Sequence, residues 1–528
     1  MYWTKRVKKS GRRIITYAAI LIIELFMATI PFSSGAAETE EISFVIFSYT
    51  IEGNTLLEKG PIIDVLEEFT GDHKTAGDVE LARDALERLY HESGYPAVLV
   101  NIPEQTVDSG AVRLEVIESR IRRVLVSGNK YYTMEKIRGE MPSIQPGNIL
   151  YLPKVRKDLA RLNGKPDLKV GIVLIPGREL GTIDVELKVE DGLPLHGSLD
   201  LNNRSTHTTT DLRLNGQIRY DNLWQKDHSV SAQFQTSPEK TNEVRLFSTS
   251  YSLPAPWEKN HLLIGYYVNS DSETASGEGI NVIGTGQIAG FRYMILLPGL
   301  PGYDHSLVVG VDWKDFEQDT EGEIVPIEYM PVTFGYASTL FDQAGSTQFS
   351  AGLNMLFRDV FFNDMDEFQA KRIGATGNYI YLTAGIERRQ KLPRNFSLFA
   401  KVDGQLADQP LVNNEQFSAG GVSSVRGYKE SEILGDNALH STVELFGPSL
   451  LKKHLLVPYV FYDCAWLAMR EAQAGEYGDT FIHGAGLGLQ GNWKKSIEFK
   501  LDWGVALEDT DDTDAGDHQI YFKVSYRF

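Results

Sequence analysis

The residues with the clearest capacity for chemistry lie in one glycine-rich stretch, Gly420–Tyr428, which reads GGVSSVRGY. Within it, Arg426 stands directly before Gly427, and a glycine at that point allows a tight loop tip. An arginine held at such a tip can reach a buried carboxylate and form a charged, bidentate hydrogen bond. We therefore predict that Arg426 holds the loop in place through an ion pair with a buried carboxylate. The alternative is an arginine that stays in solvent.

Other clusters of reactive residue types do not match a catalytic or metal-binding spacing. The acidic run Glu508–Asp514 lacks the closing glutamate of a calcium loop, so a solvated loop is the better interpretation. The glycines of 284–290 have the wrong spacing for a dinucleotide turn and indicate a strand instead. The sequence contains no nucleophile elbow, paired-histidine motif or phosphate loop, and its 11 histidines are scattered. We therefore predict no enzyme activity, no cofactor and no metal ion.

The composition limits the class of protein. The chain has 528 residues, a formal net charge of -19 and a hydrophobic content of 42%. The negative charge argues against a nucleic-acid partner. The mean hydropathy is -0.23, which fits a soluble protein or a membrane barrel, because barrel strands alternate apolar and polar residues. The single cysteine, Cys464, excludes an internal disulfide.

Residues 1–37 are predicted to be a signal peptide. Six basic residues between Lys5 and Arg13 precede the apolar run Ile14–Phe32, and small residues near Ala36 offer a cleavage site. The alternative is an uncleaved membrane anchor, but Glu24 lies inside the apolar run, where a charge is costly in a permanent span. Export from a bacterial cytoplasm follows.

Two small α/β units are predicted next, at residues 43–118 and 119–191. In each, the pattern reads strand, helix, helix, strand, strand, and a Gly-Asn turn at Gly53 or Gly128 follows the first strand. This indicates an internal repeat of roughly 75 residues. Exposed strand edges of such units can accept an extended peptide as an added strand, although inert spacers would look the same. The helix predicted from Asp78 to Ser93 has these residues on its apolar face: Val79, Leu81, Ala82, Ala85, Leu86 and Leu89.

Residues 193–528 are predicted to form a transmembrane antiparallel β-barrel of about 16 strands. Apolar and polar residues alternate through this region, for example along 212–220 and along 497–503. Short turns such as Asn222–Asp227 alternate with long polar loops such as 409–436. This alternation of short and long connections is typical of outer-membrane barrels. The last strand alternates to its end, with aromatic Tyr526 and Phe528 as the predicted signal for insertion by the outer-membrane assembly machinery.

The quartet Val425–Tyr428, placed in the longest loop, resembles the signature of the BamA-type superfamily of barrels with periplasmic POTRA domains. Within it the chain resembles the two-partner secretion transporters (TpsB, haemolysin secretion/activation type). The two POTRA-like units carry this narrower match, as do Leu162–Pro166 and Gly181–Asp184, which resemble the second POTRA domain of that family.

The resemblance implies a position for the quartet. In that family the loop folds into the barrel lumen, where its arginine meets an aspartate of a Phe-x-Asp-x-Gly strand. Here Phe461 and Asp463 occupy the matching positions, and Ala465 stands in place of the glycine. We therefore expect a contact between Arg426 and Asp463 inside the lumen. Only a few residues separate the expected cleavage site from Phe44, so a plug helix is not expected.

The function implied is type V, two-partner secretion: export of a large unfolded exoprotein, captured by the POTRA domains, across the bacterial outer membrane. The expected surroundings are outer-membrane lipid and lipopolysaccharide around the barrel, with the POTRA domains in the periplasm. One alternative is a BamA-like factor that inserts other barrels. A second is a passive diffusion pore, which would need neither POTRA unit.

Overall fold

The computed structural model describes residues 43–107, 109–272, 274–277, 280–283, 285–320, 323–358, 360, 364–451, 456–473, 478–494 and 496–528. The predicted signal peptide lies outside the described residues. Within the described part, no helix is both long enough and apolar enough to cross a membrane.

The first α/β region is built on a three-stranded sheet of order β2-β5-β4, in which β2 runs parallel to β5 and β4 antiparallel to it. A separate pairing of β1 with β3 adds a strand that the sequence pattern did not predict. The elements are β1 (Phe44–Ile46), β2 (Ser48–Glu52), α2 (Lys59–Leu66), η1 (Glu67–Phe69), β3 (Gly71–Lys74), α3 (Ala76–Glu92), β4 (Val98–Asn101) and β5 (Ala111–Glu118).

Helix α3 begins at a capping box formed by Thr75 and Asp78, which satisfies free backbone N–H groups of the first turn. Its buried face consists of Val79, Ala82, Leu86 and Tyr90. The prediction that Leu81 shares this face was wrong, since its side chain is 58% exposed. Two residues of helix correspond to about 200° of rotation, so Leu81 points away from the side that carries Val79.

The second α/β region has a sheet of order β6-β8-β7. Gly53 and Gly128 occupy equivalent turns, with φ of 81° and 87°, and a Cβ atom at either would lie 2.3 Å from a strand carbonyl oxygen, of Val116 and of Val189 respectively. Only glycine fits such a position without strain. The elements of this region are β6 (Arg120–Ser127), α4 (Met134–Gly139), α5 (Leu152–Asn163), β7 (Leu168–Pro176) and β8 (Thr182–Asp191).

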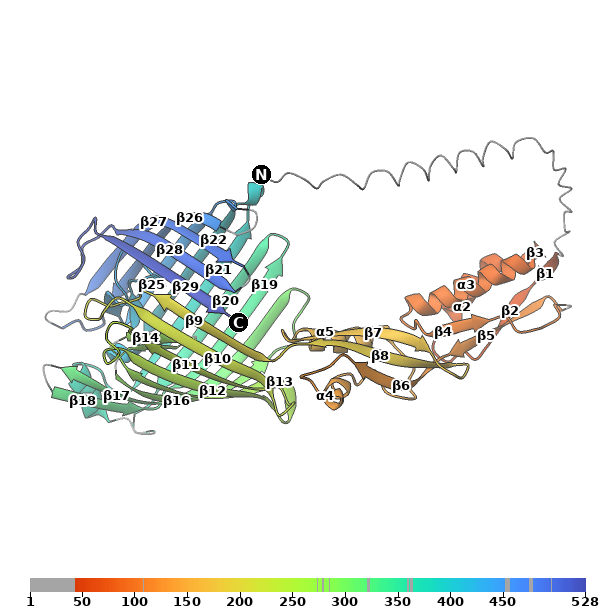
Figure 1. Ribbon diagram of the computed structural model, residues 1–528, viewed down its shortest axis with the longest axis horizontal. Helices are drawn as coiled ribbons and strands as arrows, with labels where there is room; N and C mark the ends of the chain where they lie inside the picture. Colours follow the sequence, from red (N-terminus) through yellow and green to blue (C-terminus); the bar gives the residue numbers. More distant parts are fainter. Residues whose placement is uncertain are drawn as a thin grey trace, which may run out of the picture. The chain divides into compact units, whose positions relative to one another are not determined.

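The remainder is a closed antiparallel barrel in which β29 pairs with β9 (Figure 1). Strands β18 and β19 pair with successive parts of β17 and together make one interrupted strand, so the barrel has 16 strands, as predicted. Its strands are β9 (Leu195–Asn202), β10 (Arg213–Leu223), β11 (His228–Thr236), β12 (Arg245–Ala255), β13 (Glu258–Asp271), β16 (Thr285–Leu296), β17 (Tyr303–Thr320), β18 (Glu323–Tyr329), β19 (Val332–Asp342), β20 (Gly345–Leu356), β21 (Tyr379–Lys391), β22 (Ser397–Ala407), β25 (Asn437–Phe446), β26 (Leu456–Ala468), β27 (Asp479–Trp493), β28 (Ile497–Ala506) and β29 (His518–Arg527).

The two faces of the barrel differ as the alternation predicts. Apolar side chains such as Ile218, Phe349 and Leu501 are exposed on the outer face. Their polar neighbours point inward, and several are buried there, including Gln235 and Asp502. An apolar outer face and a polar lumen are the arrangement that a lipid bilayer requires of a barrel.

The connections also differ between the two ends of the barrel. At one end the turns are short, as between β19 and β20. At the other they are long and carry structure of their own: β14 (Thr274–Gly277), β15 (Ile280–Ile283), α6 (Met365–Lys371), η3 (Asn413–Glu415), β23 (Phe417–Ala419) and β24 (Ile433–Gly435). At the short-turn end, η2 (Pro393–Asn395) joins β21 to β22.

The chain forms two compact units. Among the described residues, one unit contains 43–125 together with 141–161 and 171–187, and the other contains the barrel together with 126–140 and 162–170. Parts of the second α/β region therefore pack as one body with the barrel. Within that body, the turn between β10 and β11 supplies Asp227, which accepts hydrogen bonds from the ammonium groups of Lys136 and Lys165, both at 2.6 Å.

Candidate functional site

The loop between β22 and β25 forms a hairpin whose tip lies inside the barrel. Strands β23 and β24 pair antiparallel, from Phe417 opposite Gly435 to Ala419 opposite Ile433, and hold the segment 420–432 between them. The tip contacts inward-facing side chains of β25, β26, β28 and β29. Because these side chains alternate with lipid-facing ones such as Tyr462 and Trp503, the tip occupies the lumen.

Arg426 is the centre of the tip, and its side chain is 2% exposed. Its Nε lies 2.7 Å from Oδ2 of Asp463, and its Nη2 lies 2.9 Å from Oδ1 of the same carboxylate. Its Nη1 donates to Oε1 of Glu444 at 2.7 Å, and a third carboxylate, Asp502, lies 4.0 Å away. The guanidinium also stacks on the ring of Phe461, with 3.5 Å from Cζ to the ring centroid. A bidentate pair of this kind sets position and orientation together.

Electrostatics keep this arginine charged. Burial alone would lower the pKa of the Arg426 guanidinium, but the hydrogen bonds to Asp463 and the charges of Asp463, Glu444 and Asp502 outweigh it, and the pKa is raised. A charged group in this position needs all of its partners, because a buried and unpaired guanidinium would be strongly destabilising.

The backbone of the tip approaches the barrel wall where the wall has glycines. A Cβ at Gly484 of β27 would lie 1.9 Å from the carbonyl oxygen of Arg426, and one at Gly504 of β28 would lie 2.8 Å from the nitrogen of Gly427. Gly427 itself has φ of 117°, a conformation that side chains disfavour. These three glycines let the loop lie directly on the strands.

The tyrosine of the quartet adds further contacts between the loop tip and the barrel wall. The hydroxyl of Tyr428 donates toward the carbonyl oxygens of Glu508 and His483, at 2.9 and 3.1 Å. The hydroxyl of Tyr521 on β29 accepts from the nitrogen of Gly427 at 2.9 Å and donates to the carbonyl oxygen of Tyr428. Val425 and Tyr428 are fully buried in an apolar cluster that also contains Ala465.

The base of the loop is held by a second set of buried groups. Glu415 accepts hydrogen bonds from Tyr329 and Tyr381, each at 2.7 Å, and pairs with Lys314. Asp436, at the other end of the loop, accepts from Arg372 at 2.7 Å and from three further groups: the backbone nitrogens of Leu411 and Arg470 and the side-chain amide of Gln416. The loop is thus fixed at both ends and at its tip.

The structure brings Arg426, Phe461 and Asp463 together, and places Val425, Gly427 and Tyr428 around them. Tyr526 and Phe528 lie elsewhere, on the outer face of the closing strand, 49% and 59% exposed. Phe528 and Gly197 exchange two backbone hydrogen bonds of 3.1 Å across the seam between β29 and β9.

Sequence reasoning missed several residues of this site. Glu444 and Asp502 stand at inward positions of predicted strands, so an unusual acid on the polar face was an available signal. No such sequence signal was available for four other residues, because their partners come from segments far away along the chain. These residues are Glu415, Asp436, Gly484 and Tyr521.

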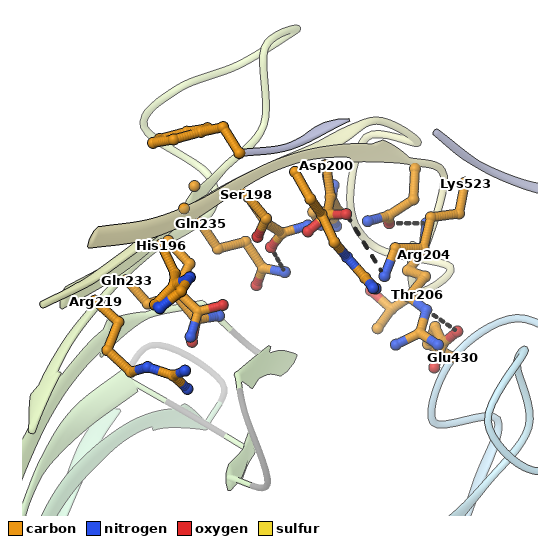
Figure 2. Close-up of a pocket in the computed structure, with 18 residues that line it drawn as sticks. His196, Ser198, Asp200, Arg204, Thr206, Arg219, Gln233, Gln235, Glu430 and Lys523 are labelled. Atoms are coloured by element: carbon orange, nitrogen blue, oxygen red, sulfur yellow. Dashed lines mark hydrogen bonds and ion pairs between the residues drawn. The ribbon is translucent and has the colours of Figure 1, made fainter. Parts of the chain in front are cut away.

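Beside the loop lies a polar cavity of about 600 Å³, lined by β9, β10, β11 and β29. Figure 2 shows that its wall carries the amides of Gln233 and Gln235 and the charged groups of Arg204, Arg219 and Lys523. Glu430 of the loop forms part of its boundary, with the guanidinium Nε of Arg204 3.9 Å from its carboxylate. The loop therefore fills one side of the lumen and leaves this side open.

Comparison with known proteins identifies the family. The description "Haemolysin secretion/activation protein ShlB/FhaC/HecB" matches residues 181–491, more than half of the chain. The chain belongs to this family. A second description, "POTRA domain, ShlB-type", matches residues 44–119. The resemblance to two-partner secretion transporters is therefore confirmed, and the protein is an outer-membrane barrel with its POTRA region in the periplasm.

Curated relatives share modest identity. The outer membrane transporter CdiB of Dickeya dadantii (strain 3937) is 27% identical over 168 residues, only 31% of this chain and 29% of that protein. The heme/hemopexin transporter protein HuxB of Haemophilus influenzae (strain 86-028NP) is 18% identical over 457 residues, 83% of this chain and 79% of HuxB. CdiB of Escherichia coli is 23% identical over 445 residues, 79% and 71% of the two chains.

Solved structures show the same fold. CdiB from Escherichia coli has a TM-score of 0.62 at 19% identity and covers 98% of both chains. BamA from Haemophilus ducreyi lacking POTRA domains 1-3 has a TM-score of 0.57 at 14% identity, covering 92% of this chain and 100% of that one. At these identities the likeness concerns architecture alone.

Proposed function

We propose that this protein exports one large partner exoprotein through its lumen, and that the loop carrying Arg426 is the closure that must move. Membership of the secretion family supports export of a partner exoprotein. The observation that carries the closure is the buried, bidentate contact of Arg426 with Asp463 on the barrel wall. A loop held in this way narrows the lumen until the contact breaks.

The POTRA region, proposed as two domains at 43–118 and 119–191, captures the partner before it enters. Both sheets end in strands that pair on one side only, such as β4 and β7. An unfolded chain can add to such an edge as a further strand, with main-chain hydrogen bonds supplying the affinity. Exposed apolar side chains beside these edges, Leu99 on β4 and Val173 on β7, suit an unfolded polypeptide.

The route of the partner follows the wall made by β9, β10 and β11. This wall borders the polar cavity, whereas the loop rests against β25 to β29. Amide side chains along the wall, such as Gln217 and Gln233, exchange hydrogen bonds with a passing backbone and bind no particular sequence. Direction comes from folding of the partner outside the cell, because the periplasm has no ATP.

The remaining interactions follow from the barrel surface. The outer apolar face contacts outer-membrane lipid, including lipopolysaccharide, and Tyr526 and Phe528 present the closing strand to the assembly machinery during insertion. We propose no covalent chemistry, because each charged group named at the loop has a structural partner there.

Secretion tests this proposal directly. The chain is co-expressed with a candidate large exoprotein from the same genome, and the exoprotein is measured in the medium. Intact protein is expected to secrete it, whereas deletion of 43–191 is expected to abolish binding and secretion, and Arg426→Ala to reduce secretion. Unimpaired binding after the deletion would exclude the capture step.

A second function, assembly of other barrels, has one observation in its favour, the structural likeness to BamA. It predicts a different phenotype, since depletion would reduce many outer-membrane proteins while the exoprotein stayed in the periplasm. A passive pore would conduct steadily and would not need residues 43–191.

A further inference from the structure

Three potential metal ligands converge at the point where the second α/β region packs against the barrel. They are Asp167, in the turn between α5 and β7, His196 on β9 and Asp221 on β10. One ligand atom of each lies within 4.8 Å of the other two, and no other group of three or more such side chains in the described part of the chain does this. All three side chains are partly exposed, so an ion could enter from water.

The backbone holds these side chains on one face. In the pairing of β9 with β10, His196 stands opposite Arg219, and Asp221 lies two residues beyond Arg219 on the same side. The nitrogen of Asp221 donates to the carbonyl oxygen of Pro194 at 2.8 Å, and the nitrogen of Gly192 donates to that of Asp167 at 2.8 Å. Figure 2 shows His196 and Arg219 side by side on the cavity wall. Because His196 lines the cavity, the site borders the lumen.

The distances suit a small tetrahedral cation. Ligands about 2.1 Å from zinc are separated from one another by roughly 3.4 Å. The Nε2 atom of His196 lies 3.6 Å from Oδ2 of Asp221 and 2.8 Å from Oδ2 of Asp167. Of these two distances, the second must lengthen by roughly half an ångström to admit the ion. Ser229 donates to the other oxygen of Asp221 at 2.6 Å, which orients that carboxylate as an outer ligand shell commonly does.

We propose that Asp167, His196 and Asp221 bind a divalent transition metal ion, with Zn²⁺ as the best match and water as the fourth ligand. Two carboxylates and a neutral imidazole neutralise a 2+ ion. An imidazole nitrogen also favours zinc over calcium or magnesium, which prefer oxygen ligands. The bound ion ties the turn after α5 to the first two strands of the barrel.

Arg219 provides the most discriminating variant. Its Nε lies 3.1 Å from Oδ2 of Asp221, so its charge occupies the position that the metal needs. If the site binds metal, Arg219→Gln removes this competitor and tightens Zn²⁺ binding. If the three residues form only an ion pair, the same substitution creates no affinity for zinc.

The experiment uses the full-length, untagged protein folded in detergent and titrates Zn²⁺ against a chromophoric chelator, with Ca²⁺ and Mg²⁺ in parallel. His196→Ala and Asp167→Asn are each expected to weaken Zn²⁺ binding roughly tenfold or more, and Arg219→Gln to strengthen it. Asp227→Asn is the matched control, because it breaks contacts at the same junction without removing a ligand. Unchanged zinc binding in His196→Ala and Asp167→Asn, or no zinc uptake by the wild type, overturns the proposal. Heat-modifiability on gels verifies that each variant is folded.

Discussion

At the scale of single residues, the protein depends on one buried charge network. Arg426 meets Asp463 and Glu444, and the neighbouring Asp502 is paired with Tyr459 and with Lys500 at 3.4 Å. An intact buried network of this kind adds little to the stability of the fold compared with apolar side chains packed in the same place. Removing one member, however, leaves buried charges without a partner and destabilises the fold. Its importance is therefore specificity: it fixes where the loop lies.

Replacing either partner of the central pair is expected to be costly. Arg426→Ala and Asp463→Ala should each lower the free energy of unfolding by about 3–5 kcal/mol, and the double variant should lose less than the sum. Denaturant unfolding in detergent, followed by tryptophan fluorescence, measures this.

The matched control is Arg388→Ala. Arg388 also pairs with an aspartate through both terminal nitrogens, to Asp342 at 2.6 and 3.1 Å, but this pair lies at the exposed end of β21. Exposed pairs contribute about 0–1 kcal/mol. Equal losses in the two pairs would contradict a special role for Arg426.

At the scale of elements, the lumen loop and the barrel wall are shaped to each other. The glycines of β27 and β28 leave room that the tip occupies, and Glu415 and Asp436 hold the base. Because the base is held by separate contacts, the tip can leave its seat while both ends stay in place. Freeing the tip therefore requires release of Arg426 together with the hydrogen bonds that Gly427 and Tyr428 make to the barrel.

Adding a side chain at a glycine beneath the loop should displace the tip of the loop from the barrel wall. A methyl group in Gly484→Ala would fall 1.9 Å from the carbonyl oxygen of Arg426, so the loop has to move away. We expect larger and more frequent conductance steps in planar lipid bilayers. Gly265→Ala is the control, since a Cβ there has no neighbour within 4 Å. Equal conductance of both variants would mean that the loop does not control the pore.

At the scale of the whole molecule, the loop and the open cavity lie against largely different strands of the barrel wall. The loop contacts β25 to β29, and the open polar cavity faces β9 to β11 and β29. The proposed route of the partner follows this cavity wall and opens once the loop leaves its position against the strands.

Site-specific cross-linking can locate the route. With Cys464→Ser removing the single native cysteine, Gln217→Cys places a thiol on the cavity wall and Ile218→Cys places one on the lipid-facing side. A stalled exoprotein is expected to cross-link to the first and not to the second. Cross-linking at neither position, while inward positions of β20 or β21 react, would move the route to the opposite wall.

Much of this architecture could be read from local patterns. Alternation along each strand predicts the barrel, because a lipid-facing row and a water-facing row leave a period of two in the sequence. The alternation of short and long connections predicts which end of the barrel carries turns and which carries loops. The Gly-Asn turns at Gly53 and Gly128 predict the repeated α/β unit. Leu81 was misplaced because it lies about 200° around the helix from Val79, on the side that faces away from the buried residues of α3.

The sequence alone determined the class of protein, an α/β region followed by a barrel. Its Val425–Tyr428 motif indicated one family and, through that family, one carboxylate partner, Asp463. Only the tertiary structure decided which groups surround Arg426, which glycines admit the loop, and which acids anchor its base. The same holds for Asp167, His196 and Asp221, which belong to three separate elements. The physical reason is that periodicity records which face of an element is buried, whereas contacts between distant segments depend on strand register and loop path, and neither leaves a local mark in the sequence.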